Sequence, residues 1–270
     1  MHPEILSNPG ATRITRVAGL ARRQARARYR RFLAEGPQCV REAVRHVPAR
    51  VHDVYLTQAA AARHPEIPAE ARRAGLYTHL VTDEVMAVMS ADAQGVLAVV
   101  DVEAASDPVP DLAAALDEAR LVAVLTEAQD PGNAGTIIRA ADAAGANAVV
   151  LVRGSVETTS PKVVRSTAGS LFHLPVITGV DLAEAVGALR SAGLAVLAAD
   201  GRGTVDLFDA DVLLATPSAW LLGNEARGLS PEALDLADAV VSIPIYGAAE
   251  SLNVATAAAV CLYASARAQR

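Results

Sequence analysis

Apolar runs and one amphipathic segment alternate between residues 121 and 152. Leu121–Leu125 and Ala148–Val152 are short and wholly apolar, which is typical of buried strands and too short for helices. Between them, apolar residues recur with helical spacing from Ile137 to Ala141, and this pattern ends at Gly145. A strand, a helix and a second strand of these lengths predict one βαβ crossover of a parallel sheet.

Polar or glycine-bearing loops follow three of the predicted strands, at residues 130–133, 223–228 and 247–253. The first is Asp-Pro-Gly-Asn, a combination of residues that favours a turn. We expect the helix to begin after it, at Ala134. If the strands are parallel neighbours, the three loops meet at one edge of the sheet and form a cleft there. The loops lack the GxGxxG spacing, so a dinucleotide site is not indicated.

The rest of the second half continues the same alternation. A serine followed by a proline opens one of its helices, at Ser230 and Pro231. The predicted strands are 194–199, 220–222 and 240–245, and the predicted helices are 160–171, 181–191, one starting at 230 and 254–268.

The first hundred residues predict a separate, smaller α/β domain. Residues 1–14 read as a poorly ordered lead-in, and the proline-containing polar stretch 103–111 reads as a domain boundary. We therefore expect domains at 1–105 and 115–270. The predicted strands are 32–35, 51–57, 77–81 and 95–102, and the predicted helices are 16–31, 37–46, 59–74 with a break near its two prolines, and 83–89.

Composition indicates a globular chain, and its charge is unevenly distributed. Hydrophobic residues make up 52% and charged residues 20% of the 270 positions. Residues 1–50 carry 11 arginines and 3 glutamates, a net of +8, so the other residues carry −14 of the total of −6. The arginines of the predicted helix 16–31 suit an anionic partner, because a guanidinium binds phosphate oxygens with two donors. A merely solvated helix is the alternative.

The remaining composition excludes several classes of protein. Cys39 and Cys261 are the only cysteines and lack the spacing of a metal site, and the six histidines show no such spacing either. The first residues lack the apolar core of a signal peptide, and the longest apolar tract, 254–264, is too short to span a bilayer. We expect a reduced, cytoplasmic protein without a metal and without a membrane segment.

Three motifs of the second domain resemble one known family. DPGNAGTIIRAADAAG, LLGNEARGLSPE and SIPIYGAAESLNVATAAAVCLY are similar, in order and spacing, to the motifs of the SpoU/TrmH family of RNA ribose 2′-O-methyltransferases, of the SPOUT class. The resemblance covers residues 121–270. More weakly, residues 13–102 resemble the L30e-like substrate-binding domain that precedes it in many members.

The resemblance implies an α/β fold: a parallel-sheet domain with a deep trefoil knot, preceded by the smaller L30e-like α/β domain. It also implies a homodimer that uses S-adenosyl-L-methionine. Ala255 departs from many members, which have serine there. By position, the implied cofactor-binding residues are Leu222, Gly223, Asn224, Gly228, Ile243, Ile245 and Leu252. The implied active-site residues are Asn133, Arg139, Glu225, Ser251 and Asn253.

The implied reaction is methyl transfer to a ribose 2′-hydroxyl of RNA. Arg139 stays protonated, so we expect it to clamp a phosphate while phosphate or water accepts the proton. For Ser251 and Asn253, helix capping is the alternative role, and Glu225 is expected to organise its loop. The basic segment favours 23S ribosomal RNA as the substrate; transfer RNA, or an idle RNA-binding scaffold, is the alternative. The predicted RNA-binding residues are Arg22, Arg23, Arg26, Arg30 and Arg165.

Overall fold

The computed structural model describes residues 5–105, 112–224 and 226–270. The chain divides into two compact units, of which the first joins residues 1–105 to Thr158–His173 and the second joins 106–157 to Leu174–Arg270. The sequence placed 158–173 within the second domain, whereas here this segment packs with the first unit. The predicted boundary, 103–111, lies largely outside the described residues.

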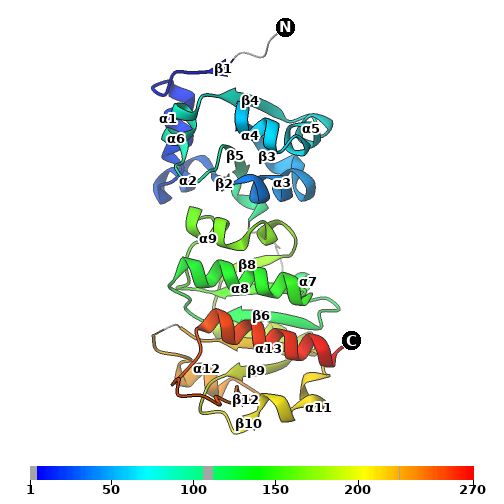
Figure 1. Cartoon of the computed structure of the whole chain (residues 1–270). Coiled ribbons are helices and arrows are strands. Elements are labelled where there is room, and N and C mark those ends of the chain that lie inside the picture. Colours follow the sequence, from blue (N-terminus) through cyan, green and yellow to red (C-terminus); the bar gives the residue numbers. More distant parts are fainter. Residues whose placement is uncertain (1–4, 106–111, 225) are drawn as a thin grey trace. The chain divides into compact units, whose positions relative to one another are not determined.

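The first unit is built on a mixed sheet in the order β1-β4-β3-β5-β2 (Figure 1). Strands β1 and β3 run parallel to β4, and β2 and β3 run antiparallel to β5. Its elements are β1 (Ile5–Leu6), α1 (Thr12–Gly19), α2 (Arg23–Tyr29), β2 (Arg31–Glu35), α3 (Pro37–His46), η1 (Pro48–Arg50), β3 (Val51–Thr57), α4 (Gln58–Arg63), α5 (Glu66–Arg73), β4 (Tyr77–Val81), α6 (Asp83–Met89), β5 (Val96–Asp101), η2 (Val102–Ala104), α9 (Pro161–Thr167) and η3 (Ser170–Phe172).

Two expectations for the start of the chain are wrong. The lead-in is ordered from Ile5 onward, and Ile14 and Val17 of α1 belong to the core of this unit. The predicted helix 16–31 is interrupted, because Arg22 has the extended backbone of an N-cap residue (φ −95°, ψ 135°). Arg16 therefore lies on α1, whereas Arg23, Arg26 and Arg28 lie on the separate helix α2.

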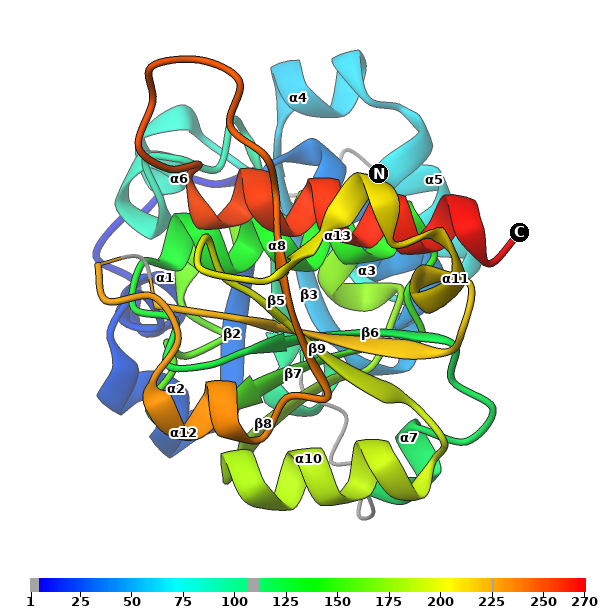
Figure 2. The same ribbon diagram turned by 90° about the horizontal axis from the view of Figure 1, so that it is seen from below.

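The second unit is a seven-stranded sheet in the order β10-β12-β9-β11-β6-β7-β8, and every pair in it is parallel. Helices α8 and α13 lie along one face and α10 covers the other (Figure 2). Its elements are α7 (Leu112–Ala115), β6 (Leu121–Leu125), α8 (Pro131–Ala144), β7 (Ala148–Val152), β8 (Val176–Val180), α10 (Leu182–Ser191), β9 (Ala195–Ala199), β10 (Val205–Asp206), η4 (Leu207–Asp209), α11 (Asp211–Leu214), β11 (Ser218–Leu222), α12 (Pro231–Asp235), β12 (Ala239–Ser242) and α13 (Val254–Ala268).

The predicted βαβ crossover is confirmed as β6–α8–β7, with both strands fully buried. Helix α8 begins at Pro131, earlier than predicted, because Asp130 caps it by accepting a hydrogen bond from the Asn133 N–H at 2.8 Å. It ends at Gly145, whose φ of 75° suits glycine. Asn133 thus lies in the first turn of a helix and not in a loop.

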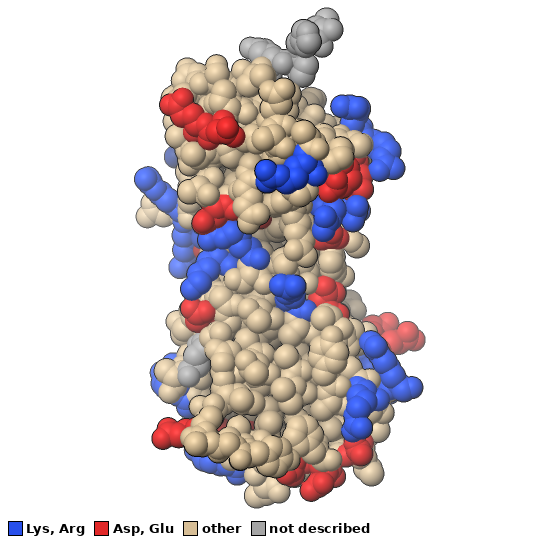
Figure 3. Space-filling view, viewed as in Figure 1, with Lys and Arg blue, Asp and Glu red and all other residues tan. Residues whose placement is uncertain are grey.

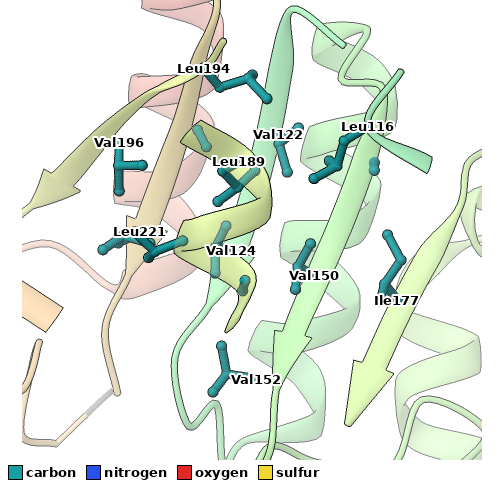
Figure 4. Packing of buried hydrophobic residues seen from close by; sticks show 14 of the residues in the cluster. Leu116, Val122, Val124, Val150, Val152, Ile177, Leu189, Leu194, Val196 and Leu221 are labelled. Carbon is teal, nitrogen blue, oxygen red and sulfur yellow. The ribbon is translucent and has the colours of Figure 1, made fainter. Parts of the chain in front are cut away.

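The core on one side of this sheet is made of branched aliphatic side chains. Leu189 of α10 packs among Val122, Val124 and Val150 of the central strands (Figure 4). Burying a side chain of this kind stabilises the fold by roughly 1.5–3 kcal/mol. This packing fixes the strands whose ends carry the polar loops.

Three strands of this sheet differ from the prediction, and one of them, the two-residue strand β10, was not predicted at all. Strand β12 stops at Ser242, short of the predicted 245, because Pro244 has no N–H to donate to a neighbouring strand. Strand β8 was not predicted; it is short, lies at the edge of the sheet and contains Gly179 at a φ of 79°. Residues 243–253 are therefore a long connection between β12 and α13.

Candidate active site

The polar loops of the second unit lie together at one edge of its sheet, as the sequence predicts. Strands β6, β11 and β12 are parallel members of one sheet, so their carboxyl ends face the same way. The Asn253 side chain donates a hydrogen bond from Nδ2 to Asn133 Oδ1 at 3.1 Å. Asn224 Nδ2 donates to the Glu127 carbonyl at 2.9 Å. These two contacts join the loops that follow all three strands.

A cavity of about 330 Å³ opens between the loops that follow β9, β11 and β12. Six of the seven predicted cofactor residues line it, and they come from the ends of β11 and β12 and from the connection to α13. Leu222 does not, since it is the last residue of β11 and is buried in the sheet. The lining residues among those predicted are Gly223, Asn224, Gly228, Ile243, Ile245 and Leu252, together with Ser251.

The 223–228 loop needs glycine at both of its ends. A Cβ added at Gly223 would lie 2.4 Å from the carbonyl carbon of Gly228, closer than any side chain tolerates. Gly228 has a φ of 69°, in the left-handed region. Reciprocal hydrogen bonds between the backbones of Asn224 and Gly228, at 3.0 and 2.8 Å, close the loop. This close approach sets Gly223, Asn224 and Gly228 against each other in the cavity wall.

Asn224 holds the loop in shape through its side chain. Its Oδ1 accepts hydrogen bonds from the Ala226 and Arg227 N–H groups at 3.0 and 3.2 Å. Arg227 in turn forms a 3.0 Å ion pair with Glu127. The side chain of Asn224 is therefore fully engaged within the protein. Glu225, predicted to organise this loop, lies outside the described residues.

Asn133 and Asn253 lie beside the cavity and do not line it. Asn253 caps α13, with its Oδ1 accepting from the Ala255 and Thr256 N–H groups at 2.9 and 3.4 Å. The capping role considered for Asn253 is thus confirmed, and the same side chain also contacts Asn133. Ser251 makes no such cap and is exposed at the cavity.

Arg139 lies about two turns into α8, on an exposed part of that helix. It does not line the cavity and forms no ion pair with any residue that the structure describes. An exposed guanidinium without a carboxylate partner is available to an anion from outside the chain.

The sequence reasoning predicted the strand beside β11, which is β9, but missed the polar loop that follows it. Ala199 ends β9, and it lines the same cavity together with the next two residues, Asp200 and Gly201. Asp200 accepts hydrogen bonds from Arg202 Nε and Nη2 at 2.9 and 3.0 Å. These bonds hold the pKa of Asp200 below its ordinary value against the opposing effect of burial, so the carboxylate is charged at neutral pH. The polar Asp-Gly pair after a buried strand was a signal that could have been used.

The predicted RNA-binding arginines have different environments in the first unit. Arg26 is only 4% exposed and donates to the Leu20 and Ala21 carbonyls at 3.1 and 2.8 Å, so it supports the turn between α1 and α2. Arg30 is exposed but forms a 2.6 Å ion pair with Glu103. Arg22 and Arg23 are exposed near the start of α2.

Arg165, the remaining predicted RNA contact, lies on α9. It forms an ion pair with the buried Glu35 and a 3.0 Å ion pair with Asp92. Both partners belong to the same unit, and they compete with any phosphate for this guanidinium. RNA binding by Arg165 stays a prediction, and its two ion pairs within the protein disfavour it.

One group of histidines comes together in space despite the absence of metal spacing in the sequence. Glu42 and His46 of α3 and His173 place three ligand-type atoms within 4.8 Å of one another, a group found among the described residues. Glu42 Oε2 lies 3.4 Å from His46 Nε2 and 3.3 Å from His173 Nε2. The expected absence of a metal stays a prediction. None of the described helices combines the length and the apolar character that a membrane span needs.

The fold and the cavity together define an α/β protein with a ligand site at the carboxyl edge of a parallel sheet. The model of the SpoU rRNA Methylase family matches residues 120–263, and that of the MRM3-like substrate binding domain matches residues 11–98. The chain belongs to the SpoU rRNA methylase family, which confirms the resemblance seen in the motifs.

Named relatives and a solved structure agree with this assignment. A 23S rRNA (uridine(2479)-2′-O)-methyltransferase of Streptomyces viridochromogenes is 42% identical over 142 residues, which are 51% of this chain and 49%, about half, of that protein. A 23S rRNA (guanosine-2′-O-)-methyltransferase RlmB of Bordetella pertussis is 29% identical over 227 residues, 83% of this chain and 92% of that protein. The SpoU methyltransferase AviRb of S. viridochromogenes in complex with AdoMet has a TM-score of 0.80 at 31% identity, covering 95% of this chain and 98% of that one.

Proposed function

We propose that this protein transfers a methyl group from S-adenosyl-L-methionine to a ribose 2′-hydroxyl of 23S ribosomal RNA. The observation that carries the proposal is the cavity at the carboxyl edge of the sheet, built from the loops after β9, β11 and β12. Family membership and the AdoMet complex of AviRb support the choice of ligand. The names of the two ribosomal RNA methyltransferases above support the choice of RNA.

The lining of the cavity suits this cofactor. Ile243, Ile245 and Leu252 offer apolar surface for an adenine ring, and the 223–228 loop offers backbone groups at close range. When bound there, S-adenosyl-L-methionine supplies an electrophilic methyl group on a sulfonium. The residues that would hold it are those of the 223–228 loop, Ile243, Ile245 and the start of α13.

The polar residues outside the cavity then position the acceptor ribose. Arg139 grips the adjacent phosphate with two donors and thereby orients the 2′-hydroxyl. The hydroxyl proton passes to that phosphate or to water, since a guanidinium keeps its own protons at neutral pH. Asn133 and Asn253 hold each other, which fixes the start of α8 against the start of α13. Ser251 is exposed at the cavity, which supports a contact between its hydroxyl and the ribose.

We propose further that two copies of the chain form a homodimer through the face beside α13. The large apolar side chains exposed there include Phe208 (52%), Val212 (88%) and Tyr263 (53%). Helix α11 is tied to α13 by the Arg267–Asp211 ion pair at 2.5 Å, so these side chains belong to one surface. Such exposed apolar residues are the usual material of a subunit interface.

The trefoil knot and the L30e-like character of the first unit belong to the same proposal, as does a cytoplasmic location. The path of the chain supports the knot: the connection after β12 leads to α13, which packs beside the earlier helix α8 (Figure 2). The mixed sheet of the first unit and its match to a substrate-binding domain support the second assignment.

The test is methyl transfer from radiolabelled S-adenosyl-L-methionine to 23S ribosomal RNA, followed by mapping of 2′-O-methyl positions. We expect label in ribosomal RNA at one ribose and none in transfer RNA. Calorimetry with the cofactor alone should show binding without RNA. A protein that binds no cofactor at millimolar concentration, or that labels a base, would contradict the proposal.

A further inference from the structure

A second cavity, in the first unit, is lined by four arginines, three of which lie within the basic segment 16–31. It measures about 620 Å³, within the roughly 300–1,000 Å³ typical of small-ligand sites. We call it the Tyr29 pocket. The residues used below, all of which line it, are Arg13, Arg16, Arg28, Tyr29, Arg31, Asp53 and Tyr55.

The charge of the Tyr29 pocket is positive. Arg13, Arg16, Arg28 and Arg31 supply four guanidinium groups, and Asp53 is the one carboxylate in the lining. Arg16 and Arg28 are exposed, and neither forms an ion pair with a residue that the structure describes. Lys and Arg side chains gather on the surface where α2 lies (Figure 3). An anionic ligand therefore fits this pocket.

Tyr29 adds an aromatic surface between two of these arginines. Its side chain is 39% exposed, and the Arg16 and Arg28 Cζ atoms lie 5.7 and 5.5 Å from the ring centroid. A tyrosine flanked by guanidinium planes is the kind of platform on which an unstacked nucleobase packs. Because a phosphate without a base would not use the Tyr29 ring, the ring favours a nucleotide as the ligand.

Tyr55 brings an unsatisfied hydroxyl to the same lining. The residue is fully buried, and its hydroxyl has no hydrogen-bond partner in the described part of the chain. Burial, and then the nearby Asp53, raise the pKa of Tyr55 to about 12, so the hydroxyl remains a donor at neutral pH. Leaving such a group unpaired costs about 1–3 kcal/mol, which a ligand with a polar edge would offset.

We propose that the Tyr29 pocket takes one unpaired nucleotide of the RNA substrate. The base packs on Tyr29, its edge bonds the Tyr55 hydroxyl, and Arg16 and Arg28 hold the flanking phosphates. The proposal rests on the proposed function for its choice of RNA, but it assigns a separate binding site in the other unit. It also differs from the single basic helix 16–31 that the sequence predicted, which the break at Arg22 divides into two.

The test is fluorescence anisotropy of labelled RNA hexamers with the full-length protein. A single-stranded hexamer should bind at least tenfold more tightly than the same strand made abasic or paired in a duplex, because paired bases cannot reach the pocket. Equal binding of the abasic strand would show a phosphate contact only. Equal binding of the duplex would show recognition of helix shape, and either result overturns the proposal.

Four variants locate the contact. Tyr29→Ala should weaken hexamer binding about tenfold and Tyr29→Phe should not, because stacking needs only the ring. Arg28→Ala should lower the salt slope by about 0.7. Arg63→Ala is the matched control, since Arg63 is an exposed arginine of α4 outside the pocket. The proposal fails if Tyr29→Ala and Arg63→Ala behave alike.

Tyr55→Phe separates binding from stability. Losing a buried, unpaired hydroxyl should leave the thermal midpoint equal or higher, while hexamer affinity falls about fivefold. Unchanged affinity in this variant would overturn the role of the hydroxyl. Cofactor binding and methyl transfer are measured separately on the wild type. A protein that binds hexamers as expected but transfers no methyl group would contradict the proposed function, but it would not contradict nucleotide binding in the Tyr29 pocket.

Discussion

Asn253 connects the stability of one helix to the arrangement of the active site. Its Oδ1 caps α13 while its Nδ2 donates to Asn133, so one amide holds two helix starts together. A carboxylate at this position would keep the cap and lose the donor. The two roles can therefore be separated by substitution.

Asn253→Asp should retain the cap, and Asn253→Ala should lose both roles. We expect the alanine variant to be destabilised by about 1 kcal/mol and the aspartate variant by less. Both should lose methyl transfer to a similar degree, because each lacks the donor to Asn133. Thermal unfolding and single-turnover kinetics measure the two effects. Full activity in the aspartate variant would mean that the contact with Asn133 is dispensable.

Arg139→Ala should reduce methyl transfer by about a hundredfold or more, since one preorganised charged contact is worth roughly that much. The thermal midpoint should not move, because Arg139 is exposed and has no ion-pair partner among the described residues. Arg139→Lys should recover little activity, since an ammonium cannot replace the two-pronged grip. A fully active lysine variant would contradict the phosphate clamp.

At the scale of elements, the loop 223–228 depends on glycine for its shape. Gly223→Ala places a Cβ against the Gly228 backbone, and that backbone cannot move without opening the loop. We expect cofactor affinity to fall at least tenfold and stability to fall by about 1–3 kcal/mol. Isothermal titration with S-adenosyl-L-methionine gives the first quantity and chemical denaturation the second.

Gly187→Ala is the control for this loop prediction. Gly187 lies within α10, and a Cβ there meets no atom within 4 Å. Alanine should stabilise that helix by roughly 0.5–1 kcal/mol and leave cofactor affinity unchanged. Equal loss of affinity in both variants would mean that the close approach at Gly223 has no special role.

Helix α1 cannot be deleted to test the basic segment, because it contributes to the core of the first unit. Ile14 and Val17 lie in the core of the first unit, so deleting residues 1–32 would remove part of that core. Loss of RNA binding after such a deletion would not distinguish phosphate contacts from unfolding. Single substitutions at exposed arginines are therefore the appropriate test of the basic segment.

For the whole molecule, the exposed apolar surface beside α13 predicts a dimer in solution. Val212→Arg should convert it to monomers at tens of micromolar, because a charge buried in an interface costs several kcal/mol. Val88→Arg is the control, since Val88 is 45% exposed in the first unit. Sedimentation velocity measures the outcome. A monomeric wild type, or a dimer that survives Val212→Arg, would contradict the proposed interface.

Local patterns in the sequence were enough to predict most elements. The crossover β6–α8–β7, the strand Val51–Thr57 and the final helix Val254–Ala268 have local causes: period, caps and breakers. The three polar loops could be placed at one edge because parallel strands end on the same side of a sheet. The motifs then indicated the family, which the comparisons confirm.

Only the tertiary structure decided which side chains meet. The carboxylate of Asp200 joins the cavity because β9 pairs with β11, a pairing that no local pattern indicates. Arg26 is buried and Arg16 is exposed, although both occupy the same basic segment, because the chain turns at Arg22. Tyr29 and Tyr55 line one pocket although β2, α3 and η1 separate them in sequence. Periodicity reports the environment within one element, whereas contacts between elements depend on how the strands are ordered and where the chain turns.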